Sequence, residues 1–360
     1  MLLPERSRMR AISAVDSISL AVQRTRDFLF RPFHWGTFLK LGLVAIITEG
    51  TGSNFHSSSN GGSSSGHGPM NLAPFNSRPE LIAAAVATLL LVMVVGLFIA
   101  YLVTRLRFAY FHCMIHDEKM IRPGWHFYRE QAGRFFWLNV AVGFGFLAVV
   151  GLIALPFISG LVKLFHESQQ GGSFDVGLLL SLVLPLIPII LLLALAGVVV
   201  DIVLRDFMLP HYALDDATAG EAWSRVCAHF EAEKRQFFAY ALLRVILPTI
   251  AMIALFMVLA IPGLVLAGGL AMVEWGLHSY FADATGGAVV VGVMLQVFFG
   301  LLAFGFGLLA MVCLGGPLST AFREYALVFY GGRYQALGEI LELSAEPVPL
   351  PPISGAAGLA

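Results

Sequence analysis

Residues 81–104 form an uninterrupted apolar segment, and this segment limits the possible folds more than any other feature of the chain. It reads LIAAAVATLLLVMVVGLFIAYLVT and contains no charge. An α-helix of about 20 apolar residues crosses the ~30 Å hydrocarbon core of a bilayer. Hydrophobic residues make up 58% of the 360 residues and charged residues only 12%, about half the charged share of a typical soluble domain. We therefore expect an all-α, multi-pass membrane protein.

Similar apolar segments recur along the chain and predict a six-span transmembrane helix bundle over residues 33–314. The predicted spans are residues 33–48, 81–104, 135–162, 177–204, 237–270 and 288–314. The first is the weakest, because it is short and contains Lys40. Lys40 can extend towards the interface, and Trp35 suits an interfacial position. A re-entrant or interfacial segment remains the alternative for residues 33–48.

The distribution of Lys and Arg predicts the orientation, because cytoplasmic segments carry an excess of these residues. Basic clusters precede the first span, separate the second from the third and the fourth from the fifth, and follow the sixth. Three segments lie between these clusters. The first holds only Arg78, the second holds only Lys163, and the third holds no basic residue. Six crossings with both termini in the cytoplasm place every basic cluster inside, which favours a crossing by residues 33–48. The predicted location is the cytoplasmic (inner) membrane.

The segments outside the spans have distinct compositions. Residues 1–32 form a basic cytoplasmic segment with an amphipathic helix, and residues 315–342 form a cytoplasmic helical segment. Residues 50–79 are rich in Ser and Gly, which is typical of a flexible outer loop, and its His56 and His67 are interpreted as linker residues. Residues 343–360 are rich in Pro and Gly and are expected to be disordered.

An internal repeat is suggested by the two central inner segments. Asp117 precedes Trp125 by eight residues, and Asp215 precedes Trp223 by the same interval. Each Trp is followed by basic residues and then by an aromatic span start. The N-terminal segment gives a weaker third copy. The predicted architecture is three tandem units, each with one amphipathic cytoplasmic helix followed by two transmembrane helices.

The inner helices are predicted from capping and periodicity. Thr218 and Glu221 have the spacing of a capping box, which starts a helix. In that helix Ala222, Trp223, Val226 and Phe230 share one face; Trp125, Tyr128 and Ala132 do so in the second copy, and Val15, Ile18, Val22 and Leu29 in the first. Helices of this kind lie in the membrane interface with Trp residues as anchors. The alternative, compatible with the first, is that they pack on the inner end of the bundle.

Three stretches of the sequence carry a family resemblance. They read RTRDFLFRPFHWGTFLKLGLVAIITEG, RLRFAYFHCMIHDEKMIRPGWHFYREQAGRFFW and DFMLPHYALDDATAGEAWSRVCAHFEAEKRQFFAYALLRVIL. They resemble a family of uncharacterised prokaryotic multi-span membrane proteins. In layout that family is similar to the membrane domain found with some bacterial glycerophosphodiester phosphodiesterases. The resemblance covers roughly residues 11–330; it implies membership of the family and supplies no catalytic residues.

Ionisable residues within membrane spans are the first candidates for a functional site, because burying them in lipid is costly. Asp201 lies near the inner end of the fourth span, and Arg244 lies about two turns into the fifth. The sequence predicts a pair between them, with Arg205 as a competing partner of Asp201. Such a pair is either a structural ion pair or a polar site lining a cleft.

His112 and His116 are spaced so that both side chains share one helical face, as in zinc-binding helices. Because no Glu base lies between them and no third ligand is predictable, interfacial histidines are the favoured interpretation and a metal site is the alternative. We find no HExxH, GxSxG or P-loop motif and no paired carboxylates within a span. No enzymatic activity, no cofactor and no nucleic-acid partner is expected.

Two functions remain open at the level of sequence. The first is a non-catalytic membrane or envelope component that contacts the lipid bilayer and other membrane proteins through its amphipathic helices. The second is a transporter or lipid-handling protein with a cleft near Asp201 and Arg244. A metal-dependent enzyme using His112 and His116 is the least favoured hypothesis.

Overall fold

A computed structural model describes residues 12–54, 79–169, 176–281 and 287–342. The predicted flexible loop lies mostly outside these residues, and the predicted disordered tail lies wholly outside them. Over the described ranges the chain forms helices and turns without a β-strand. The helices are α1 (Asp16–Phe30), α2 (Trp35–Asn54), α3 (Pro79–Ile115), α4 (Ile121–Phe127), α5 (Arg129–Gln169), α6 (Val176–Ile202), the π-helical segment η2 (Val203–Met208), α7 (Leu209–Leu214), α8 (Ala219–Ala232), α9 (Lys234–Phe281), α10 (Gly287–Gly331) and α11 (Gln335–Ile340).

Five helical stretches of the described chain are long and apolar enough to cross a membrane. They are Ala83–Ile115, Arg129–Phe157, Leu184–Leu214, Lys234–Phe281 and Val290–Gly331. The predicted first span, residues 33–48, is helical within α2 but is not among the five. A sixth span and the three-unit layout therefore remain predictions. The protein is all-helical, with several apolar helices that suit a membrane.

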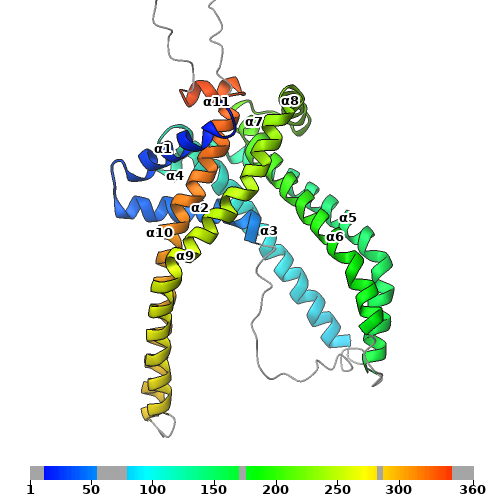
Figure 1. Cartoon of the computed structure of the whole chain (residues 1–360), viewed down its shortest axis with the longest axis vertical. Coiled ribbons are helices and arrows are strands. Elements are labelled where there is room, and N and C mark those ends of the chain that lie inside the picture. Colours follow the sequence, from blue (N-terminus) through cyan, green and yellow to red (C-terminus); the bar gives the residue numbers. More distant parts are fainter. Residues whose placement is uncertain (1–11, 55–78, 170–175, 282–286, 343–360) are drawn as a thin grey trace, which may run out of the picture. The chain divides into compact units, whose positions relative to one another are not determined.

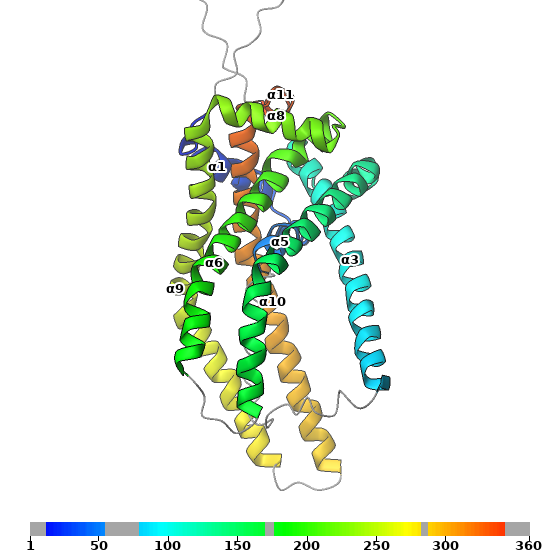
Figure 2. The same ribbon diagram turned by 90° about the vertical axis from the view of Figure 1, so that its right-hand side faces the viewer.

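The described chain divides into two compact units. Unit 1 comprises residues 1–50 and 230–360, and unit 2 comprises residues 51–229. In unit 1, α9 and α10 lie side by side as a long hairpin, while α1 and α2 run across it (Figures 1 and 2). In unit 2, α5 and α6 form the corresponding hairpin, and α3 packs against α4 and α5.

In both units the buried side chains are concentrated at one end of the long helices. Unit 1 buries Phe237 and Tyr240 near the start of α9 and most residues between Thr320 and Tyr330 on α10. Unit 2 buries residues 108–111 near the end of α3 and residues 207–213 around η2 and α7. The central parts of the long helices are apolar and exposed instead. An apolar surface this extensive requires an apolar solvent, which a bilayer supplies.

Two glycines set the contact between α2 and α10. A Cβ built on Gly316 would lie 2.7 Å from the Cα of Gly42, and a Cβ on Gly42 would lie 3.3 Å from the carbonyl oxygen of Val312. The two backbones therefore touch directly, as in the small-residue contacts of membrane helices. This contact lets Leu41, Ala45 and Thr48 of α2 become buried.

The segment η2 interrupts the regular winding of the helix that follows α6. The Leu209 amide donates to the carbonyl of Leu204, five residues earlier. Pro210 follows at the start of α7 and has no amide hydrogen to donate, which weakens the regular ladder at this point. Short π-helical turns of this kind are frequent at functional sites, and η2 begins two residues after Asp201.

Candidate functional site

Asp201 and Arg205 meet at the junction of α6 and η2. Arg205 Nη1 donates a hydrogen bond of 3.1 Å to Asp201 Oδ2, and the arginine side chain is almost fully buried. The two residues are four positions apart, so one helical turn brings them together. Arg205, the competing partner in the sequence analysis, is therefore the residue that bonds to Asp201.

Arg244 bonds to a carboxylate that the sequence analysis did not select. Arg244 Nη2, on α9, donates a hydrogen bond of 3.2 Å to Glu49 Oε2, on α2. The Nε of Arg323, on α10, lies 4.0 Å from Glu49 Oε1. The Glu49 side chain is 7% exposed and that of Arg323 is 3% exposed. Asp201 and Arg244 belong to different units and each has another ionic partner, so their predicted pairing stays a prediction.

Glu49 was missed for an identifiable reason. It directly follows the apolar segment 33–48, so it lies outside the predicted span and outside the set of ionisable residues within spans. Its partner Arg244 is 195 residues away in the chain, and no periodic pattern connects such distant positions. The usable signal was a single carboxylate next to an apolar helix, since such residues are typically paired when buried.

Two more arginines form ion pairs at the end of unit 1 where the start of α9 and the end of α10 meet. Arg24 Nε, on α1, donates a 3.2 Å hydrogen bond to the buried carboxylate of Glu324. Arg333, after α10, donates bonds to Glu233, at 2.8 and 3.1 Å, and to the backbone carbonyls of Ile12 and Phe329. These charge-assisted bonds tie the N-terminal segment, the start of α9 and the end of α10 together.

The two predicted anchor tryptophans have different surroundings. Trp125 is partly buried, and its backbone carbonyl accepts two hydrogen bonds from Arg105, whose guanidinium lies 4.5 Å from the Trp125 ring. Trp223 on α8 is 54% exposed. Trp125 thus contacts the protein itself, whereas much of the Trp223 ring is open to its surroundings.

His112 and His116 lie close together, as their spacing predicts. Their ring centroids are 4.3 Å apart, and His112 Nε2 lies 3.8 Å from a carboxylate oxygen of Glu118. Among the described residues no group of three or more His, Cys, Asp or Glu side chains is arranged to hold a metal ion. The structure therefore brings two nitrogen ligands together without assembling a metal centre in the described part of the chain.

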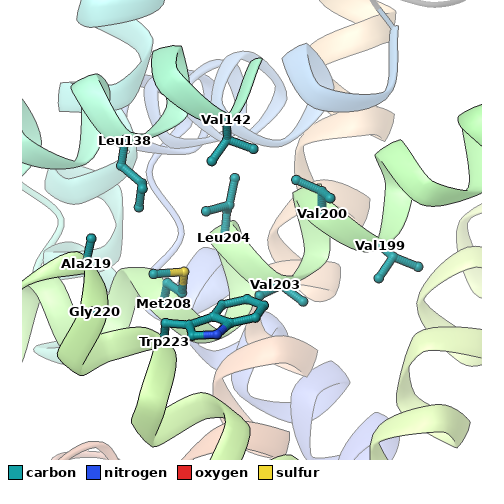
Figure 3. Close-up of a pocket in the computed structure, with 10 residues that line it drawn as sticks. All are labelled: Leu138, Val142, Val199, Val200, Val203, Leu204, Met208, Ala219, Gly220 and Trp223. Carbon is teal, nitrogen blue, oxygen red and sulfur yellow. The ribbon is translucent and has the colours of Figure 1, made fainter. Parts of the chain in front are cut away.

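An apolar groove of about 540 Å³ lies in unit 2 next to η2 (Figure 3). Its lining residues come from α5, α6, η2 and α8 and are Leu138, Val142, Val199, Val200, Val203, Leu204, Met208, Ala219, Gly220 and Trp223. The Val142 and Leu204 side chains point towards one another in Figure 3. No pattern in the sequence predicts this groove, because it depends on how four helical segments pack.

Two charged pairs lie close in the sequence to residues that line the groove. Arg134, one turn before Leu138, bonds to Asp216, three residues before Ala219. Arg225, two residues after Trp223, bonds to Asp215. The α8 helix begins with the predicted capping box, in which the Thr218 amide donates a 3.0 Å bond to Glu221. The backbone and side-chain hydrogen bonds from Thr218 lower the pKa of Glu221.

Comparison with known proteins gives one match. Residues 12–340 match the model of a family described as a family of unknown function (DUF7544). The chain belongs to this family. The family expectation is confirmed to that extent, but nothing found links the chain to the membrane domains of glycerophosphodiester phosphodiesterases. No curated protein and no solved structure matches the chain.

Proposed function

We propose that this protein is a non-catalytic, six-crossing component of the cytoplasmic membrane that assembles with other membrane proteins through its inner helices. The observation that carries the proposal is that apolar side chains of α1 stay exposed outside the face that this helix buries. That helix buries a face of small and aromatic residues, namely Ser17, Ala21, Thr25 and Phe28, together with Leu29. Val15 and Val22 are 65% and 56% exposed. An apolar face left open at the inner end of a membrane protein suits contact with a partner or the lipid interface.

The path of the chain supports six crossings. Within unit 1, Arg333 bonds to both Glu233 and Ile12, and the Ala14 amide donates to Gln236. The N-terminal segment and the start of α9 therefore share one side of the membrane. Between them the chain passes through three long apolar stretches, in α3, in α5 and in α6 to α7. Three crossings would end on the opposite side, so a fourth is needed between Phe30 and Pro79.

We place the start of that fourth crossing in α2, which is 20 residues long. Glu49, near the end of α2, pairs with Arg244 and Arg323. These arginines lie about two to three turns from the ends of α9 and α10 that share a side with Ile12, so α2 alone does not reach the opposite side. Its charged residues Lys40 and Glu49 reduce its hydropathy, but Glu49 is neutralised by Arg244 and Arg323. The positions of the Lys and Arg clusters then favour cytoplasmic termini.

Cysteine labelling tests this topology. In a variant with Cys113, Cys227 and Cys313 replaced, a cysteine at Ser57 should react with a membrane-impermeant maleimide in intact cells. A cysteine at Gln23 should react only after the membrane is permeabilised. Labelling of both positions only after permeabilisation would contradict a crossing between them.

Assembly is tested by purification in mild detergent. The protein is expected to retain a stoichiometric membrane partner, which should be lost in the Val15→Ser/Val22→Ser variant. The matched control is Val290→Ser/Val291→Ser, which changes two exposed valines at the start of α10. Recovery of the protein alone in every detergent and after cross-linking in cells would contradict the proposal.

The apolar groove favours a second candidate function, lipid handling. Its wall includes Val200, which directly precedes Asp201, and Val203, which follows it by two residues. This function predicts lipid or solute flux in liposomes that is reduced in Asp201→Asn. Absence of flux in the unaltered protein would exclude it without affecting the assembly proposal.

A further inference from the structure

The groove in unit 2 has the dimensions and lining of a binding site for a flexible apolar chain. Its volume of about 540 Å³ falls within the range of small-ligand sites. Every lining residue is apolar or Gly, apart from the indole nitrogen of Trp223. Leu138 and Val142 are one turn apart on α5, so they extend the groove along that helix.

Local structure keeps the groove open. A Cβ on Gly220 would meet no atom within 4 Å, so the start of α8 leaves free space there. In η2, Arg205, Asp206 and Phe207 are buried within the protein, while Val203, Leu204 and Met208 line the groove. The π-helical winding thus separates the polar side chains from the groove.

The ion pair Arg134–Asp216 precedes the lining residues Leu138 and Ala219 in the sequence, and we take it as one end of the groove. Arg134 is one helical turn, about 6 Å, from Leu138, and its guanidinium bonds to Asp216. Both side chains are exposed, and an exposed ion pair contributes only about 0–1 kcal/mol. Exchanging the partner of either charge for another opposite charge therefore costs little free energy.

We propose that the groove binds one acyl chain of phosphatidylethanolamine, with the lipid phosphate on Arg134 and the lipid ammonium on Asp216. The Arg134–Asp216 pair exchanges partners in this step, so that each charge again faces an opposite one. A guanidinium binds phosphate through two parallel hydrogen bonds. The exposed Trp223 ring lies beside the chain, a position typical of tryptophan at the membrane interface.

The charges at this end argue against a purely anionic lipid. A phosphate without an ammonium would take Arg134 and leave Asp216 unpaired, with Asp215 and Glu221 close by in the chain. Like charges in proximity oppose binding. A quaternary ammonium has no N–H group to donate to Asp216, so phosphatidylcholine should bind less tightly than phosphatidylethanolamine.

Native mass spectrometry of the full-length protein in detergent tests the proposal by titration with phosphatidylethanolamine, phosphatidylcholine and phosphatidylglycerol. We expect one tight site for phosphatidylethanolamine. Arg134→Gln should weaken it about tenfold, as expected for loss of a charge-assisted contact. Asp216→Asn should reduce the preference for phosphatidylethanolamine over phosphatidylglycerol by a similar factor.

A groove-filling variant separates the acyl-chain site from general lipid adhesion. Gly220→Leu should abolish the tight site, because the new side chain occupies the open space. The matched control is Gly151→Leu on α5, where a Cβ also meets no atom within 4 Å and which is not among the lining residues; it should bind as the unaltered protein does. Equal binding of all three lipids, tighter binding of phosphatidylglycerol, or unchanged binding in Gly220→Leu would overturn the proposal.

This inference goes beyond assembly and does not depend on it. It names a ligand for the groove, which is the feature that favours the lipid-handling function. Lipid binding and lipid flux are measured separately. Tight binding without flux would refute lipid handling alone. Loss of the partner protein in Val15→Ser/Val22→Ser with lipid binding intact would show that the two sites act independently.

Discussion

The carboxylate of Glu49 on α2 accepts a 3.2 Å hydrogen bond from the guanidinium of Arg244 on α9. Arg323 of α10 lies on the other side of the same carboxylate, at 4.0 Å. One acidic side chain thus joins three helices of unit 1 that are far apart in the sequence. The stability of the α2 position should depend on this single charge.

Removing the Glu49 charge should strongly destabilise unit 1. Glu49→Gln leaves the guanidiniums of Arg244 and Arg323 without this carboxylate, and breaking a buried ion pair from one side costs about 3–5 kcal/mol. The measurement is the free energy of unfolding in mixed micelles. Asp27→Asn, which removes the exposed pair of Asp27 with Arg31, should change it by less than about 1 kcal/mol. Equal effects of the two substitutions would mean that Glu49 is not buried.

A methyl group at Gly316 should displace α2 from α10. Gly316→Ala places a carbon 2.7 Å from the Cα of Gly42, and overpacking of this kind costs about 1–3 kcal/mol. Gly300→Ala, on the same helix with no atom within 4 Å of the new carbon, should be neutral or slightly stabilising, because Ala favours helix over Gly. Thermal unfolding of both variants in one detergent provides the comparison. The expectation fails if Gly316→Ala melts at or above the temperature of Gly300→Ala.

Replacing Arg333 with lysine should destabilise the protein. The arginine bonds to Glu233, Ile12 and Phe329 at once, and its guanidinium lies 4.0 Å from the Phe329 ring. A lysine ammonium cannot reproduce this planar, multiply bonded arrangement. We expect Arg333→Lys to cost about 2 kcal/mol and to make the N-terminal segment more sensitive to protease. Arg235→Lys on the exposed face of α9 serves as the control, and identical proteolysis of the two variants would refute the prediction.

The start of α8 should loosen at acidic pH. Hydrogen bonds from Thr218 lower the pKa of Glu221, so the carboxylate stabilises the folded helix at pH values above the ordinary glutamate pKa. That contribution is lost as the pH falls through the lowered pKa of the folded state. Amide exchange at Ala222 and Trp223, corrected for intrinsic rates, should therefore accelerate on acidification. In Glu221→Gln the corrected rates should not depend on pH in this range, and a persisting dependence would assign the effect to another group.

The sequence predicted the apolar parts of the helices better than their full extent. The predicted span 237–270 lies within α9, which runs from Lys234 to Phe281. At its start α9 packs on other parts of the protein, as the buried Phe237 and Tyr240 show, whereas residues 271–281, beyond the predicted span, are mostly exposed. Hydropathy detects the part that suits lipid, and the helix extends beyond that part at both ends.

The face of α1 that contacts the protein coincides only in part with the apolar stripe of Val15, Ile18, Val22 and Leu29. Leu29 is buried, but so are Ser17, Ala21, Thr25 and Phe28, which lie outside that stripe. Close helix packing favours small residues, and Ser17 and Thr25 satisfy their hydroxyls on the backbone carbonyls of Ser13 and Ala21. A hydrophobicity pattern cannot identify such a face, because its residues are selected for size.

The π-helical segment η2 has a consequence for insertions and deletions. The Leu209 amide donates to the carbonyl of Leu204, five residues earlier. This turn therefore contains one more residue than a turn of α-helix. Deleting one residue between Val203 and Met208 should restore regular winding and leave α7 in its present register, because a π-turn accommodates one additional residue within an otherwise α-helical segment. The helix would survive and even become more regular, while the apolar hollow beside it would lose part of its wall. The irregular turn is thus the specific feature that a shorter homologue would lack, together with any lipid held against it.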